Sequence, residues 1–117
     1  MREIKFKEVD KVDEKVLTEI VNRILNVVNP VKIILFGSYA YGKPRRGSDL
    51  DILVVVDDLA SSRRELRIKI RSSLREFLIP KDILVATLKD IEEWEKVPQA
   101  FITSIVKKGK VIYEKKD

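Results

Sequence analysis

The chain has 117 residues, of which 44% are hydrophobic and 37% charged, and its formal net charge is +5. This length fits one domain, and we expect a single domain over residues 1–117. The absence of cysteine and histidine excludes disulfides, the usual zinc sites, cysteine nucleophiles and Ser-His-Asp triads. Catalysis would then depend on carboxylates, hydroxyls, lysine, arginine or a hard metal such as Mg²⁺, which binds oxygen ligands.

No apolar run approaches the ~20 residues that span a bilayer, and the segment Met1–Lys5 lacks the apolar core of a signal peptide. We therefore expect a cytoplasmic protein that is not inserted in a membrane. The positive charge suits phosphorylated ligands, nucleic acid or an acidic protein, and it is equally typical of a surface that is charged for solubility alone.

The first half of the chain predicts a helix, a strand and a short turn. Apolar residues recur every four positions from Val12 to Val28, which indicates an amphipathic helix that ends at Asn29–Pro30. The β-branched run Val31–Phe36 predicts a strand. Ser38 is then expected to cap one helical turn that Gly42 closes.

The second half predicts further strands and helices. Leu50–Val56 is apolar on both faces, which is typical of a central strand in a sheet covered by helices. The elements expected after it are a helix from Ser61–Ser62 with a buried face extending to Leu78 and stopped by Pro80, a strand Asp82–Ala86, a short helix Lys89–Trp94, a helix from Pro98 through Val106 closed by Gly109, and a strand Val111–Tyr113.

The connections between these elements predict the sheet. The first two strands are joined too briefly for a parallel crossover and should be antiparallel, whereas a long helix joins the second to the third, so that pair should be parallel. We therefore expect an α/β (α+β) domain with a mixed sheet flanked by helices. This topology brings Gly37–Ser38, Asp49–Asp51 and Asp82 to one edge of the sheet.

The aspartates carry the chemistry. Asp49 and Asp51 are one residue apart at the start of a strand, so both side chains point the same way. Two carboxylates on one face repel each other unless a cation lies between them, and Mg²⁺ is the natural candidate. The alternative is that Asp49 caps a turn and Asp51 pairs with an arginine. Asp82 begins the neighbouring strand and could join them. The alternative is that Asp82 is only a turn residue after Pro80–Lys81.

Gly37 and Ser38 are candidates for binding phosphate. A glycine lets the backbone approach a ligand closely, and the free N–H groups of the following turn favour an anion. The hydroxyl of Ser38 is a further donor. Taken alone, Gly-Ser is more often an ordinary turn between a strand and a helix.

The combination resembles the signature of the DNA polymerase β-like nucleotidyltransferase superfamily. It consists of Gly37–Ser38, ten intervening residues and then Asp49–Asp51, within the stretches Leu35–Gly42 and Gly47–Val54. The chain looks most like the minimal nucleotidyltransferases, called MNT proteins. The resemblance covers the first three strands and extends to the tail Gly109–Glu114, which is similar to their usual ending.

The resemblance implies a metal-dependent transfer of a nucleoside monophosphate, with AMP from ATP expected, to a hydroxyl group. Asp49 and Asp51 would bind two Mg²⁺ ions, and Asp82 would hold the catalytic metal and help to activate the attacking hydroxyl. Many relatives carry arginine where Tyr41 stands. The residues implied in nucleotide binding are Gly37, Ser38, Ser48, Arg45 and Arg46, with Lys43 as another possible substitute for that arginine.

The resemblance also implies a partner. Minimal nucleotidyltransferases are typically paired with a small helical HEPN protein, an RNase toxin, and some transfer AMP to a tyrosine of that toxin. We therefore expect an antitoxin enzyme. The alternative is a non-catalytic antitoxin or nucleotide-binding module that neutralises its partner by binding. Binding of nucleic acid ranks last because no groove-reading motif is present.

Other residues could belong to partner or base-binding surfaces. Arginines recur every four positions on the long helix, which predicts either a basic stripe for a partner or a solvated face. Trp94 is a candidate interface anchor, with a core or rim position as the alternative. Tyr39 and Tyr41 could stack on a base or simply pack. The arginines of the stripe are Arg63, Arg67, Arg71 and Arg75.

Overall fold

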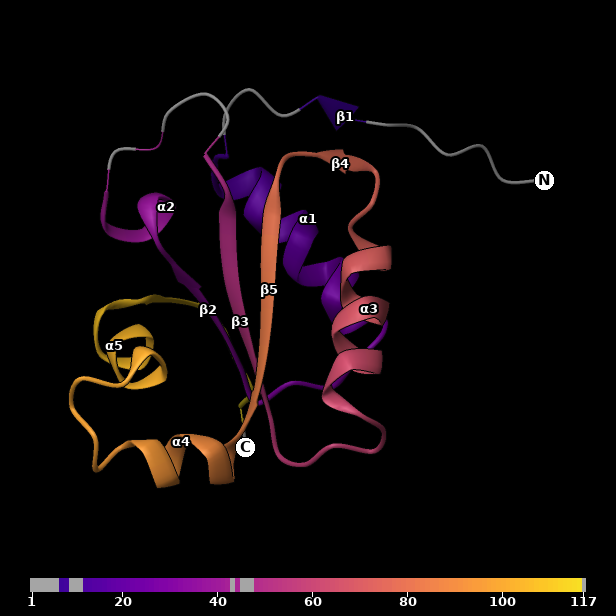
Figure 1. Cartoon of the computed structure of the whole chain (residues 1–117). Helices are drawn as coiled ribbons and strands as arrows, with labels where there is room; N and C mark the ends of the chain where they lie inside the picture. Colours follow the sequence, from indigo (N-terminus) through magenta and orange to yellow (C-terminus); the bar gives the residue numbers. More distant parts are fainter. Residues whose placement is uncertain (1–6, 9–11, 43, 45–47, 117) are drawn as a thin grey trace.

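The structure, a computed structural model, describes residues 7–8, 12–42, 44 and 48–116, and it is a sheet with helices on both faces (Figure 1). The elements follow the chain in the order β1 (Lys7–Glu8), α1 (Glu14–Leu25), β2 (Lys32–Phe36), α2 (Ser38–Tyr41), β3 (Leu50–Val56), α3 (Arg63–Ser73), β4 (Phe77–Leu78), β5 (Lys81–Thr87), α4 (Leu88–Trp94), α5 (Phe101–Lys108) and β6 (Lys110–Glu114). None of the helices in this part of the chain has the length and apolar composition needed to cross a bilayer.

The main sheet has the strand order β5-β3-β2-β6. Strand β3 is antiparallel to β2 and parallel to β5, so both predicted pairings are confirmed. Across the sheet, Asp51 of β3 lies opposite Phe36 of β2 on one side and Asp82 of β5 on the other. Strand β6 pairs antiparallel with the other side of β2, and the register shifts between Ile33 and Ile34.

Each face of the sheet has its own core, because side chains alternate along the strands. Helices α1 and α3 cover one face, and α4 and α5 cover the other (Figure 1). Strand β3 is buried on both sides, as its apolar run predicts. The core under α1 and α3 includes Ile20, Ile24, Leu35, Ile52, Val54, Ile70 and Leu74. The core under α4 and α5 includes Ile34, Phe36, Leu53, Val55, Ala86 and Ile105.

Helix α1 begins with a side-chain cap and ends earlier than predicted. The carboxylate of Asp13 accepts a hydrogen bond from the N–H of Val16 at 2.9 Å, which satisfies one of the unpaired donors of the first turn. The apolar stripe was expected to remain helical up to Asn29–Pro30. Instead, the helix ends at Leu25, and a turn follows in which the N–H of Val28 bonds to the carbonyl of Ile24 at 3.0 Å.

The predicted extension of the long helix to Leu78 is wrong. The helix begins after Ser62 as expected, and the Ser62 hydroxyl caps it by accepting a hydrogen bond from the N–H of Glu65 at 3.0 Å. The helix ends at Ser73, however, and Phe77–Leu78 forms a strand that pairs in parallel with Lys7–Glu8. Pairing with a distant segment therefore overrides the local helical periodicity here.

The expected stripe of four arginines is only partly formed. Arg75 lies beyond the end of α3. Arg63 pairs with Asp90 of α4 at 2.6 Å, and Arg71 donates a hydrogen bond to the carbonyl oxygen of Lys81 at 3.0 Å. Two of the predicted cations therefore bind groups within the chain, which reduces their availability to a partner.

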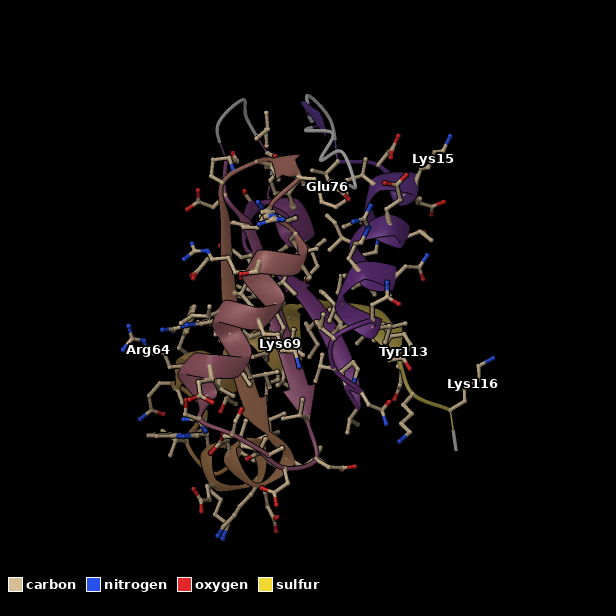
Figure 2. The ribbon with its side chains drawn as sticks, turned by 90° about the vertical axis from the view of Figure 1, so that its right-hand side faces the viewer. Lys15, Arg64, Lys69, Glu76, Tyr113 and Lys116 are labelled. Atoms are coloured by element: carbon tan, nitrogen blue, oxygen red, sulfur yellow. The ribbon has the colours of Figure 1, made fainter. Side chains whose placement is uncertain are left out.

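An ion pair connects α1 to the segment that follows α3. Arg23 of α1 pairs with Glu76, whose side chain is 14% exposed, and Figure 2 shows Glu76 between the two helices. The guanidinium of Arg23 also lies 6.0 Å from the centroid of the Phe77 ring. These contacts hold the short β4 segment against the first helix.

The last helix begins later than predicted. Pro98 was expected to be its first residue, but the helix starts at Phe101, with Ala100 in the N-cap position. Gly109 ends the helix, as expected. The hydroxyl of Thr103 donates a hydrogen bond to the carbonyl oxygen of Trp94 at 2.6 Å, which ties α5 to the end of α4.

Candidate functional site

Aspartates gather at the edge of the sheet where β2 ends and where β3 and β5 begin (Figure 1). Asp51 and Asp82 are register partners on neighbouring strands, which run ~4.8 Å apart. Asp51 alternates with Leu53 and Val55 of the core under α4 and α5, so its side chain points to that face. Asp82 alternates with Ala86 of the same core and shares this orientation.

The electrostatics of the cluster favour a cation. Burial raises the pKa of the Asp51 carboxyl, and the neighbouring carboxylates of Asp82 and Asp49 raise it further. Asp51 is half-buried, whereas Asp49 and Asp82 are exposed. A cation bound between these groups would relieve both the repulsion and the cost of burying the Asp51 charge.

The donor set fits a hard divalent metal. All three side chains offer carboxylate oxygens, the ligands that Mg²⁺ prefers, at one edge of the sheet, and those of Asp51 and Asp82 lie on the same face. Within the described residues, no three Asp, Glu, His or Cys side chains are already close enough to hold a metal together. Mutual repulsion opposes such convergence in the absence of a cation. Asp49 and Asp82 would therefore reorient on binding.

Gly37 lies against the Asp51 carboxylate. Its φ of +74° is in the region that side-chain-bearing residues rarely adopt. A Cβ atom at this position would collide with Oδ2 of Asp51. The sequence predicted that glycine lets the backbone approach a ligand at this turn. The structure shows a close approach to Asp51 instead, and the contact with a ligand stays a prediction.

Helix α2 is the short helical turn expected after Gly37, but its cap differs from the prediction. The N-cap is Gly37, and Ser38 is the first helical residue, so Ser38 does not cap the turn. The carbonyl oxygen of Gly37 accepts hydrogen bonds from the N–H groups of Ala40 at 3.0 Å and Tyr41 at 3.2 Å. Gly42 closes the turn as predicted, with its N–H on the carbonyl oxygen of Ser38 at 3.1 Å.

The other residues predicted to bind the nucleotide are placed only in part. Ser48 is half-buried and directly precedes Asp49, close to the aspartate cluster. Arg45, Arg46 and Lys43 lie outside the described residues, so their predicted contribution to phosphate binding stays a prediction.

Tyr39, Tyr41 and Phe101 lie near this edge, whereas Trp94 lies on α4, which follows the opposite end of β5. Tyr39 packs against the core under α1 and α3, which is the packing alternative, whereas Tyr41 is 56% exposed. Trp94 is 47% exposed at the end of α4. Sequence reasoning did not single out Phe101, which is 63% exposed and contacts Phe36 edge to face. No sequence signal marks it as exposed, because it lies four residues before Ile105, which is buried on the same side of the helix.

Solved structures share this architecture. A candidate nucleotidyltransferase from Sulfolobus solfataricus has 22% sequence identity and a TM-score of 0.59, and the match covers 87% of this chain and 80% of that chain. A toxin–antitoxin complex with AMP-PNP contains a chain with 26% identity and a TM-score of 0.52, covering 86% and 74% respectively. A mutant of the toxin–antitoxin complex MntA–HpeT gives 21% identity and a TM-score of 0.54, covering 90% and 75%.

A spectinomycin adenyltransferase from Enterococcus faecialis, solved with ATP and spectinomycin, has 20% identity and a TM-score of 0.55, and the match covers 86% of this chain and 57% of that chain. No match to a curated protein was found. The family model described as polymerase beta, nucleotidyltransferase matches residues 18–117, which include the whole aspartate edge. The chain therefore belongs to the polymerase beta nucleotidyltransferase family.

Proposed function

We propose that the chain is a minimal nucleotidyltransferase domain over residues 1–117 that transfers AMP from ATP, with Mg²⁺, to a hydroxyl group of a partner protein. We further propose that the partner is a HEPN-type toxin and that the acceptor is a tyrosine. The observation that carries the proposal is the aspartate edge, where Asp51 lies in register with Asp82 and against Gly37. Family membership and the likeness to a toxin–antitoxin chain with AMP-PNP support it.

We assign the metal ligands to Asp49, Asp51 and Asp82. Bound Mg²⁺ would neutralise the triphosphate charge and stabilise the attacking and leaving oxygens. The same cations would offset the raised pKa of Asp51, because they favour its charged form. Half-burial and the contact with Gly37 restrict Asp51, whereas the exposed Asp49 and Asp82 can adjust to the ligand.

The chain's own groups would position the reactants. We assign the phosphate contacts to the first N–H groups of α2 and the Ser38 hydroxyl, because the first N–H groups of a helical turn have no partner within it. We assign Asp82 to the acceptor side, where its carboxylate would accept the hydroxyl proton. The acceptor oxygen would then form a bond to the α-phosphorus in line with the bond that breaks, and pyrophosphate would leave.

The acceptor would come from another protein. The match covers only 57% of the spectinomycin adenyltransferase chain, which was solved together with a small acceptor. A partner that docks over the aspartate edge could supply both the hydroxyl group and the remaining walls of the site. Most of the rate acceleration would then come from positioning and charge neutralisation.

A transfer assay tests the enzyme. ATP labelled at the α-phosphorus is incubated with Mg²⁺, the chain and the product of a neighbouring gene that encodes a small helical protein. We expect label on the partner, loss of labelling with Asp49→Asn or Asp51→Asn, and retention with Asp57→Asn, an exposed carboxylate just beyond the other end of β3. Undiminished transfer by folded Asp49→Asn would refute the assigned role.

The likeness to toxin–antitoxin chains also favours a second candidate, an antitoxin that neutralises its toxin by binding alone. That function predicts that the double variant Asp49→Asn/Asp51→Asn still forms the complex and still suppresses toxicity. If the folded double variant binds the toxin but leaves it active, neutralisation by binding alone is excluded and the enzymatic route is favoured.

A further inference from the structure

We infer that Phe101 is the platform on which the base of the bound nucleotide stacks. This inference deepens the proposed function and rests on it. It adds an apolar, aromatic subsite to a site that is otherwise built from carboxylates, backbone N–H groups and hydroxyls.

The position of Phe101 follows from two contacts. Phe36 of β2 is the cross-strand partner of Asp51, and directly opposite side chains project from the same face with Cβ atoms ~5 Å apart. The rings of Phe36 and Phe101 then meet edge to face, with their centroids 5.8 Å apart and an interplanar angle of 83°. One buried ring therefore separates the exposed Phe101 ring from the aspartate edge.

Phe101 is exposed, although the residues nearest to it in the core are buried. Phe36 is 3% exposed, and Ile105 of the same helix is 1% exposed, yet Phe101 is 63% exposed. An exposed ring one side chain away from the carboxylate cluster offers an apolar surface that a ligand bound there can cover. The base of a nucleotide can cover the Phe101 ring, because every base has a π-face that stacks on an aromatic side chain.

The ring is also held in place before any ligand binds. The contact with Phe36 fixes one side, and the buried Thr103 ties the start of α5 to Trp94 through the 2.6 Å hydrogen bond. Stacking on a ring that is already positioned costs less ordering entropy than stacking on a free side chain. If the triphosphate of ATP binds at the aspartates, the nucleoside would extend along the sheet face of Asp51 and Phe36 towards Phe101.

The test distinguishes binding of the base from binding of the phosphates. Calorimetric titration measures the affinity for Mg²⁺-ATP and for Mg²⁺-tripolyphosphate, which has no base. We expect Phe101→Ala to weaken ATP binding about five-fold or more and to leave tripolyphosphate binding unchanged. Phe101→Tyr should keep the ATP affinity. Trp94→Ala is the matched control, because α4 follows the end of β5 that is opposite Asp82.

Each outcome is decisive. If Phe101→Ala retains the full ATP affinity while Asp51→Asn abolishes it, the stacking inference is wrong and the proposed function stands. An equal loss of ATP and tripolyphosphate binding by Phe101→Ala would assign a structural role and also overturn the inference. If the wild-type chain, alone and with its partner, binds neither ligand, the proposed function itself fails.

Discussion

Replacing Gly37 with alanine should damage both the fold and the site, because two separate features of the structure require glycine there. The backbone φ is +74°, and an added Cβ would collide with Oδ2 of Asp51. With its ψ of −155°, this backbone conformation is one that essentially only glycine adopts, and it costs an L-residue ~1–3 kcal/mol. Turning the Asp51 side chain away from its rotamer costs a further ~0.5–1.5 kcal/mol.

We therefore expect Gly37→Ala to lower the free energy of unfolding by ~1.5–4.5 kcal/mol, the sum of these costs. The measurement is chemical denaturation at equilibrium, and a double-mutant cycle separates the two causes. In an Asp51→Ala background the carboxylate is absent, so Gly37→Ala should cost only the ~1–3 kcal/mol of the backbone. Metal-dependent ATP binding should be lost in Gly37→Ala even where the protein remains folded.

Gly42→Ala is a useful comparison, because Gly42 closes the same turn with a φ of −112°, which any residue can adopt. It should leave the position of the Asp51 carboxylate unchanged. If Gly37→Ala costs the same in the wild type and in the Asp51→Ala background, the proposed collision with the carboxylate does not exist. The reasoning about the site geometry would then be refuted.

Three further changes test the electrostatics. The pKa of Asp51 is raised, so the folded state loses stability as the pH rises above the ordinary value of 3.8 through the pKa of the folded state. In the absence of metal, Asp51→Asn should therefore be more stable than the wild type near neutral pH, as measured by urea titration. The opposite holds for Asp90, whose pKa is lowered mainly by the backbone N–H of Thr87: its contribution is present above 3.8 and is lost as the pH falls through the folded pKa. Asp90→Ala removes the N3 partner of the Thr87 cap of α4, whose carboxylate accepts a hydrogen bond from the N–H of Thr87, and should cost ~1 kcal/mol near neutral pH. This cost should shrink in acid, and a constant cost would contradict the assignment. Arg23→Ala leaves the largely buried Glu76 without its cation and should cost ~1–3 kcal/mol by thermal or urea unfolding, whereas Lys15→Ala on the same helix should be nearly neutral.

The central part of the fold was predictable because its signals are local. The apolar run of β3, its short connection to β2 and its long helical connection to β5 predict the mixed sheet without knowledge of distant contacts. The same logic predicts that Asp51 and Asp82 share one edge, since each aspartate lies at or near the start of its strand. Alternation along a strand then orients their side chains.

Elements that depend on pairing between distant segments were not predictable in the same way. The periodicity of the long helix continues to Leu78, yet Phe77–Leu78 pairs with Lys7–Glu8, a segment that carried no strand signal. The arginine spacing likewise predicts one stripe, but ion pairing to Asp90 depends on where α4 packs. Local propensity is a weak influence that tertiary contacts override.

The sequence by itself determined the chemistry available to this protein: carboxylates and hydroxyls, with no cysteine or histidine, in a spacing that resembles one superfamily. Only the tertiary structure decided how those groups are supported. The contact of Gly37 with Asp51 and the contact of Phe101 with Phe36 each join different elements of the fold. Such contacts arise from the packing of helices and strands, and no local spacing of residues specifies them.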